Sequence, residues 1–263
     1  MSSNTLALAV RDSRTMLRRN LLHARRYPSL TLNLLLTPIM LLLLFVYLFG
    51  DVMSTGIGGA DRSAYIAYLV PGILLMTIGG TVVGAAVSVA TDMNEGIIAR
   101  FRTMAIHRGS VIVGHVAGSV VQCVLSVALV AAVAVAIGFR STDTTALEWL
   151  AAFGTLVLFS LALTWLAVAM GLVSPNAEAA ANLAQPLVLL PLMSSAFVPV
   201  ESMPGWFRPV AEYQPFTPAI ETLRGLLLGT GIGHHGWLTL AWGVGLAVVG
   251  YFWTTAKFNR DPK

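Results

Sequence analysis

Six long runs of uncharged, mostly apolar residues constrain this chain more than any other feature of its sequence. An α-helix rises about 1.5 Å per residue, so about 20 residues cross the roughly 30 Å hydrocarbon core of a bilayer. Asp, Glu, Lys and Arg stand outside these runs or, like Glu148, at an edge. The pattern predicts an all-α integral membrane protein with six transmembrane helices. The predicted spans are residues 30–49, 65–90, 111–137, 147–173, 182–198 and 237–256, the fifth being short and broken by Pro186 and Pro191.

Composition agrees with a surface that faces lipid. Only 11% of the 263 residues are charged, whereas a soluble domain carries about a quarter. So few charges could not cover a water-soluble globule of this size, and we expect the chain to meet lipid over most of its surface. The single cysteine, Cys123, lies inside an apolar run, which excludes a disulfide framework and a thiol metal site.

The distribution of Lys and Arg predicts the orientation of the spans, because cytoplasmic loops of membrane proteins are enriched in these residues. Twelve of them precede the first run, follow the second run or follow the last run. The alternate loops hold four, which are Arg62, Arg140, Arg208 and Arg224. We therefore expect both termini in the cytoplasm.

Two segments on the cytoplasmic side are expected to be helical without crossing the membrane. Residues 1–28 place apolar side chains on one stripe and arginines on another, which predicts an amphipathic helix along the inner membrane surface. Residues 91–110 form a loop with a helical core from about 94 to 106. Residues 29–256 would then form the transmembrane domain, followed by a cytoplasmic tail at 257–263.

The outer loop at residues 200–235 carries two apparent helix starts, each with a proline in the first turn. The first is Ser202 before Pro204. The second begins at Thr217 and Pro218, ends at Gly229 and pairs Glu221 with Arg224 at helical spacing. Each piece has about ten residues, too few to span a bilayer, so we expect short re-entrant helices in the outer leaflet.

The chain lacks the lysine of a P-loop and the side chains that ion-coupled transporters and membrane enzymes usually place within the membrane. A P-loop needs a lysine before Ser or Thr, and neither Lys257 nor Lys263 precedes one. Ion-coupled transporters usually place ionisable residues within the membrane, and none stands in the middle of a predicted span. The histidines, His115 among them, are expected to be polar interface residues. We predict a transport subunit that is not itself an enzyme and binds no cofactor and no nucleic acid.

The inner loop is the best candidate for the place where an external motor acts. Phe101, Met104 and Ile106 stand among basic residues there, and a helix that docks in a groove needs such apolar anchors with charged flanks. The alternative is a positively charged loop whose arginines pair with lipid phosphates, although lipid pairing requires none of the apolar residues.

Several motifs in this order and spacing resemble those of ABC-2 permeases, the membrane subunits of type-2 ABC exporters, especially the daunorubicin/doxorubicin-resistance type. Residues 91–108, with the core Arg-Phe-Arg-Thr-Met-Ala-Ile, resemble the family's inner loop. Residues 197–207 and 214–218 resemble its signature before the last span, and residues 69–73 resemble its entry to the second span. The resemblance covers essentially the whole chain.

The resemblance implies a six-helix permease of the bacterial plasma membrane. It would dimerise with a second copy or a paralogue and bind two ABC ATP-binding subunits, which carry the ATP and magnesium. The residues implied to touch the ATPase are Glu95, Arg100, Phe101, Arg102 and Arg108. Those implied to close the outer end are Glu201, Pro204, Trp206, Glu221 and Arg224. Many family members have a more charged loop at residues 94–98, which leaves the ATPase partner open.

A substrate path would need polar groups within the spans. The uncharged polar residues that stand out are Asn33, Gln122, Asn182 and Gln185. Buried polar groups in membranes either bond to a neighbouring helix or line a cavity, and both readings stay open here. We expect an exporter of a hydrophobic or amphiphilic compound, drug or lipid-like. The alternatives are an ion-coupled secondary exporter and a membrane assembly subunit with no transport role.

Overall fold

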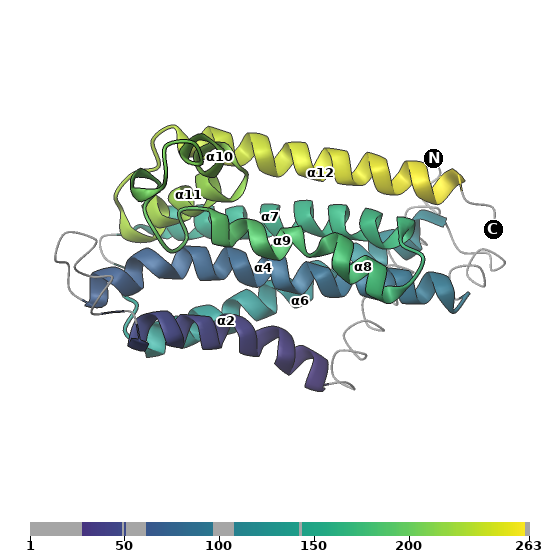
Figure 1. The fold of residues 1–263 in the computed structure, drawn as a ribbon, viewed down its shortest axis with the longest axis horizontal. Coiled ribbons are helices and arrows are strands. Elements are labelled where there is room, and N and C mark those ends of the chain that lie inside the picture. Colours follow the sequence, from purple (N-terminus) through teal and green to yellow (C-terminus); the bar gives the residue numbers. More distant parts are fainter. Residues whose placement is uncertain (1–27, 49, 51–61, 97–107, 142–143, 261–263) are drawn as a thin grey trace.

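A computed structural model of the protein describes residues 28–48, 50, 62–96, 108–141 and 144–260. The described residues form helices, turns and coil, with no strand among them. The predicted amphipathic helix at 1–28 and most of the helical core at 94–106 lie outside these ranges, as do Arg100, Phe101 and Arg102. The helices run roughly side by side, with a cluster of short elements at one end (Figure 1).

Within the part of the chain that the structure describes, four helices are long and apolar enough to cross a membrane. They are the apolar parts of α4 (Arg62–Asn94), α6 (Arg108–Ala136), α7 (Ala146–Val173) and α12 (His235–Arg260). Two shorter apolar helical stretches, Leu36–Leu48 and Ala177–Met193, fall in the first and fifth predicted spans. The structure thus shows a multi-pass helical membrane protein.

Helix α4 is the centre of the bundle. It packs against α2 (Pro28–Leu48), α6, α7, α8 (Ala177–Ala184) and α11 (Phe216–Leu228). Figure 1 shows α7 and α12 on one side of it and α2 on the other. Its side chains Tyr65, Leu69, Ile73, Leu75 and Ile78 are fully buried. The buried hydroxyl groups of Thr77 and Thr81 donate to carbonyls one turn earlier, at 2.7 and 2.8 Å, so they need no partner elsewhere.

The fifth apolar run does not form one continuous helix. Asn176 caps α8, and the chain then breaks at Gln185 into α9 (Pro186–Leu189) and the 3₁₀ turn η1 (Leu190–Met193). Helical structure therefore ends at Met193, five residues before the predicted end of the span at 198. Pro186 and Pro191 explain the break, because each removes a backbone N–H that an uninterrupted helix would use.

Glycine allows α4 to approach this broken segment closely. A Cβ atom placed on Gly72 would lie 2.6 Å from the Cβ atom of Ala196, which is far inside van der Waals contact. On the same helix, a Cβ on Gly79 would collide with the carbonyl oxygen of Leu187. A larger residue at Gly72 would push α4 away from the turn that follows η1, and one at Gly79 would push it away from α9.

We call residues 194–234 the cap, because they cover one end of the bundle (Figure 1). The cap contains η2 (Val200–Ser202), α10 (Arg208–Tyr213) and α11. The predicted end of α11 is confirmed, since Gly229 takes the left-handed conformation with φ of 65°. The predicted start at Pro204 is wrong: its carbonyl accepts from the backbone N–H of Phe207 and Arg208 in a turn, at 2.9 and 3.0 Å. The Pro204–Gly205 pair favours a turn, and α10 begins at Arg208 with Pro209 in its first turn instead.

Candidate functional site

The densest set of long-range polar contacts lies where α4 meets the cap, and Arg224 is at its centre. Its Nη2 donates to the carbonyl oxygens of Tyr68 and Ser195, both at 3.0 Å. Its Nη1 donates to Oε1 of Glu221 at 2.5 Å. The guanidinium carbon also lies 3.8 Å from the centroid of the Tyr68 ring. One side chain on α11 thus contacts α4, the turn after η1 and its own helix.

Tyr68 and Ser195 complete this joint. The Tyr68 hydroxyl donates to the Ser195 carbonyl at 3.0 Å, so that carbonyl accepts from both the phenol and the guanidinium. The Arg224 side chain is only 11% exposed and the Glu221 side chain 28%. An arginine this far from water needs such partners, because an unpaired buried charge is costly. We call Tyr68, Ser195, Glu221 and Arg224 the cap joint.

Polar side chains of the cap also satisfy the carbonyl groups that the broken fifth run leaves open. Gln214 Nε2 donates to the carbonyl oxygens of Leu190 and Met193, both at 3.1 Å. Thr217 Oγ1 accepts from the Ser195 N–H at 3.3 Å and donates to the Ala211 carbonyl. Gln214 therefore bonds the cap to the end of the broken run, and Thr217 bonds the first residues of the cap to α10.

The opposite end of α4 carries a second polar contact. His115 Nε2 on α6 lies 3.1 Å from Asp92 Oδ2 on α4, and the two side chains are 9% and 11% exposed. These residues stand just before and just after the segment that links the two helices. Sequence reasoning treated His115 as a lone polar interface residue, and the structure corrects this. The sequence held no signal for the pair, because the two residues are 23 positions apart and belong to different helices.

A second apolar cluster includes residues within one helical turn of Asp92 and His115 in the sequence. Its members come from α4, α6, α7 and α12, and they are Val89, Ile112, Val116, Val168, Leu172 and Phe258. This packing ties the ends of four helices together beside Asp92 and His115. Movement of the segment between α4 and α6 would therefore reach several helices at once.

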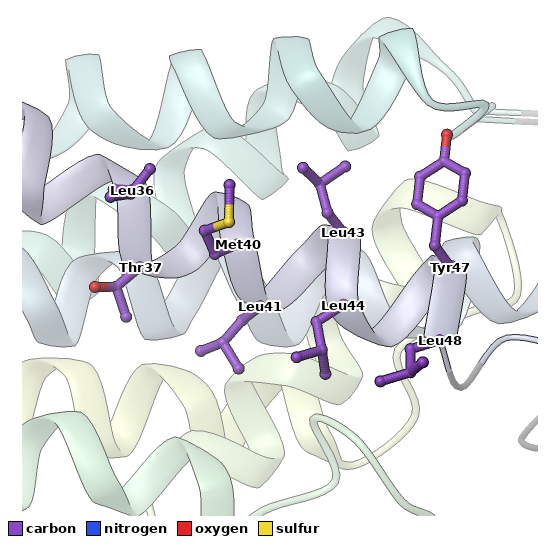
Figure 2. A pocket seen from close by; sticks show the side chains of 8 residues that line it. All are labelled: Leu36, Thr37, Met40, Leu41, Leu43, Leu44, Tyr47 and Leu48. Carbon is purple, nitrogen blue, oxygen red and sulfur yellow. The ribbon is translucent and has the colours of Figure 1, made fainter.

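Two apolar spaces lie along the sides of the bundle. One is a groove of about 710 Å³ along α2, with described lining residues Leu36, Thr37, Met40, Leu41, Leu43, Leu44, Tyr47 and Leu48 (Figure 2). The other is a cavity of about 170 Å³ between α4, α6, α7 and α11. Among the described residues, no group of three or more His, Cys, Asp or Glu could hold a metal ion.

Comparison with known proteins identifies the family. The family model described as ABC-2 type transporter matches residues 11–228. This chain belongs to that family. Among the relatives of the ABC-2 chain is the daunorubicin resistance ABC transporter permease protein DrrB1 of Streptomyces coeruleorubidus, 29% identical over 85% of this chain and 77% of that protein.

Two further relatives of the ABC-2 chain come from other bacteria. The probable doxorubicin resistance ABC transporter permease protein DrrC of Mycobacterium tuberculosis (strain H37Rv) is 22% identical over 66% of this chain and 64% of that protein. Nodulation protein J of Rhizobium meliloti (strain 1021) is 28% identical over 82% of each chain.

The structure divides the outer-gate residues predicted for this ABC-2 chain into two groups. Glu221 and Arg224 form the predicted pair, now inside the cap joint. Glu201, Pro204 and Trp206 lie exposed on the cap, and Trp206 is 81% exposed. Sequence reasoning missed Tyr68 and Ser195, although Arg224 gave an indirect signal: a guanidinium has five N–H donors, and Glu221 alone cannot accept from all of them.

The predicted coupling residues of the ABC-2 chain are only partly described. Glu95 is exposed in the turn that ends α4, where its N–H donates to the Thr91 carbonyl at 2.9 Å. Arg108 is the first residue of α6. Arg100, Phe101 and Arg102 lie outside the described residues, so their predicted role stays a prediction.

The residues predicted to line a substrate path lie on three helices and at one helix break. Asn33 is on α2 and Gln122 is half-buried on α6. Asn182 is exposed on α8, and Gln185 is exposed at the break after it. Of these four, Gln122, Asn182 and Gln185 are not among the described residues that line the groove or the cavity.

Proposed function

We propose that this chain is the membrane subunit of an ATP-driven ABC exporter that moves a hydrophobic or amphiphilic compound out across the bacterial plasma membrane. The observation that carries the proposal is the ABC-2 match over residues 11–228. Two relatives named as daunorubicin or doxorubicin resistance permeases support a drug-like or lipid-like substrate.

The arrangement of α4 supports a mechanism for coupling. Asp92 and Tyr68 lie near opposite ends of α4. At the usual rise per residue of an α-helix, they are separated by about 36 Å along its axis. Closure of the ATPase subunits would push on the loop at 91–110, and the Asp92–His115 contact would pass that push to α4 and α6. Helix α4 would then shift beneath the cap joint and loosen the cap at the outer end.

The membrane topology we propose has six spans, with both termini in the cytoplasm. The four long helices would be joined by α2 and by the broken helix from α8 to η1. Residues 1–28 would lie along the inner membrane surface, residues 29–256 would form the transmembrane domain and residues 257–263 a cytoplasmic tail. Helices α10 and α11 would be the re-entrant helices of the outer leaflet.

We propose that the permease works as a dimer with a second copy or a paralogue. Helix α2 exposes Met40, Tyr47 and Leu48 to 53%, 64% and 67%, and the region from α8 to η1 exposes Leu189 and Met193 to 47% each. Exposed apolar side chains of this kind suit helix contact within the membrane. The substrate path would run along this interface between the first, second and fifth spans.

The proposed motor is a pair of ABC ATP-binding subunits, which would supply ATP and magnesium. Glu95, Arg100, Phe101, Arg102 and Arg108 would contact them. The first test is ATP hydrolysis by the co-purified complex in lipid, comparing the wild type with a Phe101→Ala, Arg102→Ala double variant. A Leu17→Ala, Arg18→Ala double variant is the matched control, because it also removes one apolar residue and one arginine from a segment proposed to be cytoplasmic.

We expect the Phe101→Ala, Arg102→Ala variant to release the ATPase subunit or to uncouple hydrolysis from efflux, while the control behaves as the wild type. If no ATPase subunit co-purifies with the wild type, the proposal fails. Efflux that continues with a hydrolysis-deficient ATPase subunit and an intact proton gradient would point instead to ion-coupled transport.

A further inference from the structure

The cavity between α4, α6, α7 and α11 is separate from the cap joint, the inner pair and the α2 groove. Its lining is almost entirely apolar and includes Val70, Val127, Ala152, Leu156 and Leu227. The one hydroxyl in the lining, that of Ser160, donates to its own helix at the Leu156 carbonyl, at 2.7 Å. The cavity therefore suits a hydrocarbon group rather than a polar one.

The cavity opens sideways, toward the region where lipid would lie. Val135 on α6 and Trp149 and Phe153 on α7 line it and are 48%, 47% and 52% exposed. Both helices are long and apolar enough to span the membrane. In a bilayer the open side of the cavity would face lipid acyl chains, so an acyl chain could enter the cavity directly from the membrane.

A cation is held at the outer rim of the same cavity. Arg140 Nη1 donates to the carbonyl oxygens of Val135 and Phe139, at 2.8 and 2.9 Å, and both residues line the cavity. Arg140 is exposed, and no carboxylate of the described residues lies within ion-pair distance of it. The hydroxyls of Ser141 and Thr144 donate to the carbonyl of Leu227, another lining residue, and so fasten this rim to α11.

The size of the cavity separates two classes of occupant. Sites for drug-sized molecules measure about 300–1,000 Å³, so 170 Å³ is too small for such a compound. Part of one acyl chain needs less room, because the rest of the lipid stays in the bilayer. An anionic phosphate is the head group that an arginine at the level of the membrane interface binds best.

We propose that this cavity is a binding site for one acyl chain of an anionic phospholipid in the leaflet on the cap side, with the lipid phosphate against Arg140. Such a lipid would fill the space between α6 and α7. It would also stabilise the rim at Arg140, Ser141 and Thr144, where the two hydroxyls bond to α11. The site goes beyond the proposed export function and does not depend on the direction of transport.

The test is native mass spectrometry of the full chain, titrated with phosphatidylglycerol or phosphatidylcholine after delipidation. For the wild type we expect one tightly held phosphatidylglycerol per chain, bound about tenfold better than phosphatidylcholine, because the choline ammonium of phosphatidylcholine repels Arg140 and offsets the attraction of the phosphate that both lipids carry. Arg140→Gln should remove this preference and Arg140→Lys should largely keep it. A merely structural role of Arg140 in holding backbone carbonyls would not produce that difference between lipids.

A second pair of variants tests the tail. Ala128→Leu places a larger side chain in the cavity lining at a position that is itself exposed, and Ala132→Leu makes the same change one turn along α6, outside the lining. We expect Ala128→Leu to weaken both lipids several-fold and Ala132→Leu to leave them unchanged. Arg208→Gln, on the exposed surface of the cap, is the matched control for charge.

Equal binding of both lipids by the wild type, or unchanged binding by both Arg140→Gln and Ala128→Leu, would overturn the proposal. So would displacement of the retained lipid by the amphiphilic cation ethidium in the wild type but not in Ala128→Leu, because the cavity would then be a subsite for transported compounds. None of these results bears on whether an ATPase subunit associates, so the export proposal stands or falls by its own test.

Discussion

The guanidinium of Arg224 lies 3.8 Å from the ring centroid of Tyr68 and also donates a hydrogen bond to the backbone carbonyl of that same residue. The two residues are 156 positions apart in the chain. This double contact holds the cap on the central helix. Under the proposed mechanism, a movement of α4 would reach the cap first through this joint.

We predict that Arg224→Met destabilises the protein by about 3–5 kcal/mol, because it leaves Glu221 without its cation and takes the guanidinium donor away from the carbonyls of Tyr68 and Ser195. The stability of Arg224→Lys should lie between those of the wild type and Arg224→Met, because lysine keeps the positive charge but lacks the planar set of N–H donors of the guanidinium. Unfolding in detergent can be followed with a thiol-reactive dye, as the single cysteine, Cys123, is fully buried. Tyr68→Phe is the control, because it removes one hydroxyl contact and keeps the ring beneath the guanidinium. A Met variant as stable as the wild type would contradict the cap joint.

The close approach of α4 to Ala196 predicts opposite effects of one substitution at two glycines. Gly72→Ala should destabilise by about 1–3 kcal/mol, because the new methyl group meets Ala196 at 2.6 Å. Gly80→Ala should stabilise by about 0.5–1 kcal/mol, because a methyl group there meets nothing within 4 Å and alanine favours a helix. Both shifts can be read in the same thermal assay. Equal shifts at the two positions would mean that the 194–198 turn does not pack on α4 as described.

The Asp92–His115 contact predicts a loss of coupling rather than a loss of hydrolysis. Removing one partner of a buried pair costs about 3–5 kcal/mol, whereas replacing both with apolar residues is often neutral. Asp92→Leu with His115→Leu should therefore be more stable than either single variant, yet should hydrolyse ATP with little efflux. ATPase activity and dye efflux, measured on the same proteoliposomes, check this. His234→Leu, an exposed change in the loop before α12, is the control.

The exposed Trp206 predicts an effect on transport without an effect on folding. At 81% exposure its side chain buries little surface, so Trp206→Ala should change stability by no more than about 0.5 kcal/mol. Reduced efflux would then support its proposed role at the outer end.

Trp242→Phe should affect stability instead, because Trp242 Nε1 donates to the Tyr213 carbonyl at 3.0 Å. The free energy of unfolding of Trp242→Phe should be about 0.5–1.5 kcal/mol lower than that of the wild type.

Local features of the fold could be predicted because their causes are local. The end of α11 follows from one glycine that takes a positive φ, and the Glu221–Arg224 pair follows from helical spacing within a single element. The predicted start of the first cap helix at Pro204 was wrong for a related reason. Pro204 and Pro209 both suit a first turn, and only the turn at Gly205 selects the second.

The sequence by itself determined that this chain would be a bundle of apolar helices. Backbone polar groups in lipid must be satisfied within the structure, and long uncharged runs leave the helix as the available solution. It also determined which charges would lie outside the spans. The motif residues alone also indicated the ABC-2 family, and the match of the family model to residues 11–228 confirms it.

Only the tertiary structure decided which partners those residues take. Arg224 meets Tyr68 and Ser195 because the fifth apolar run breaks and α4 carries a glycine where the turn approaches. His115 meets Asp92 because two helices pack at one register, and the cavity near Arg140 exists because four helices leave a gap between them. Such contacts depend on helix packing across long separations, for which a sequence has no periodic signature.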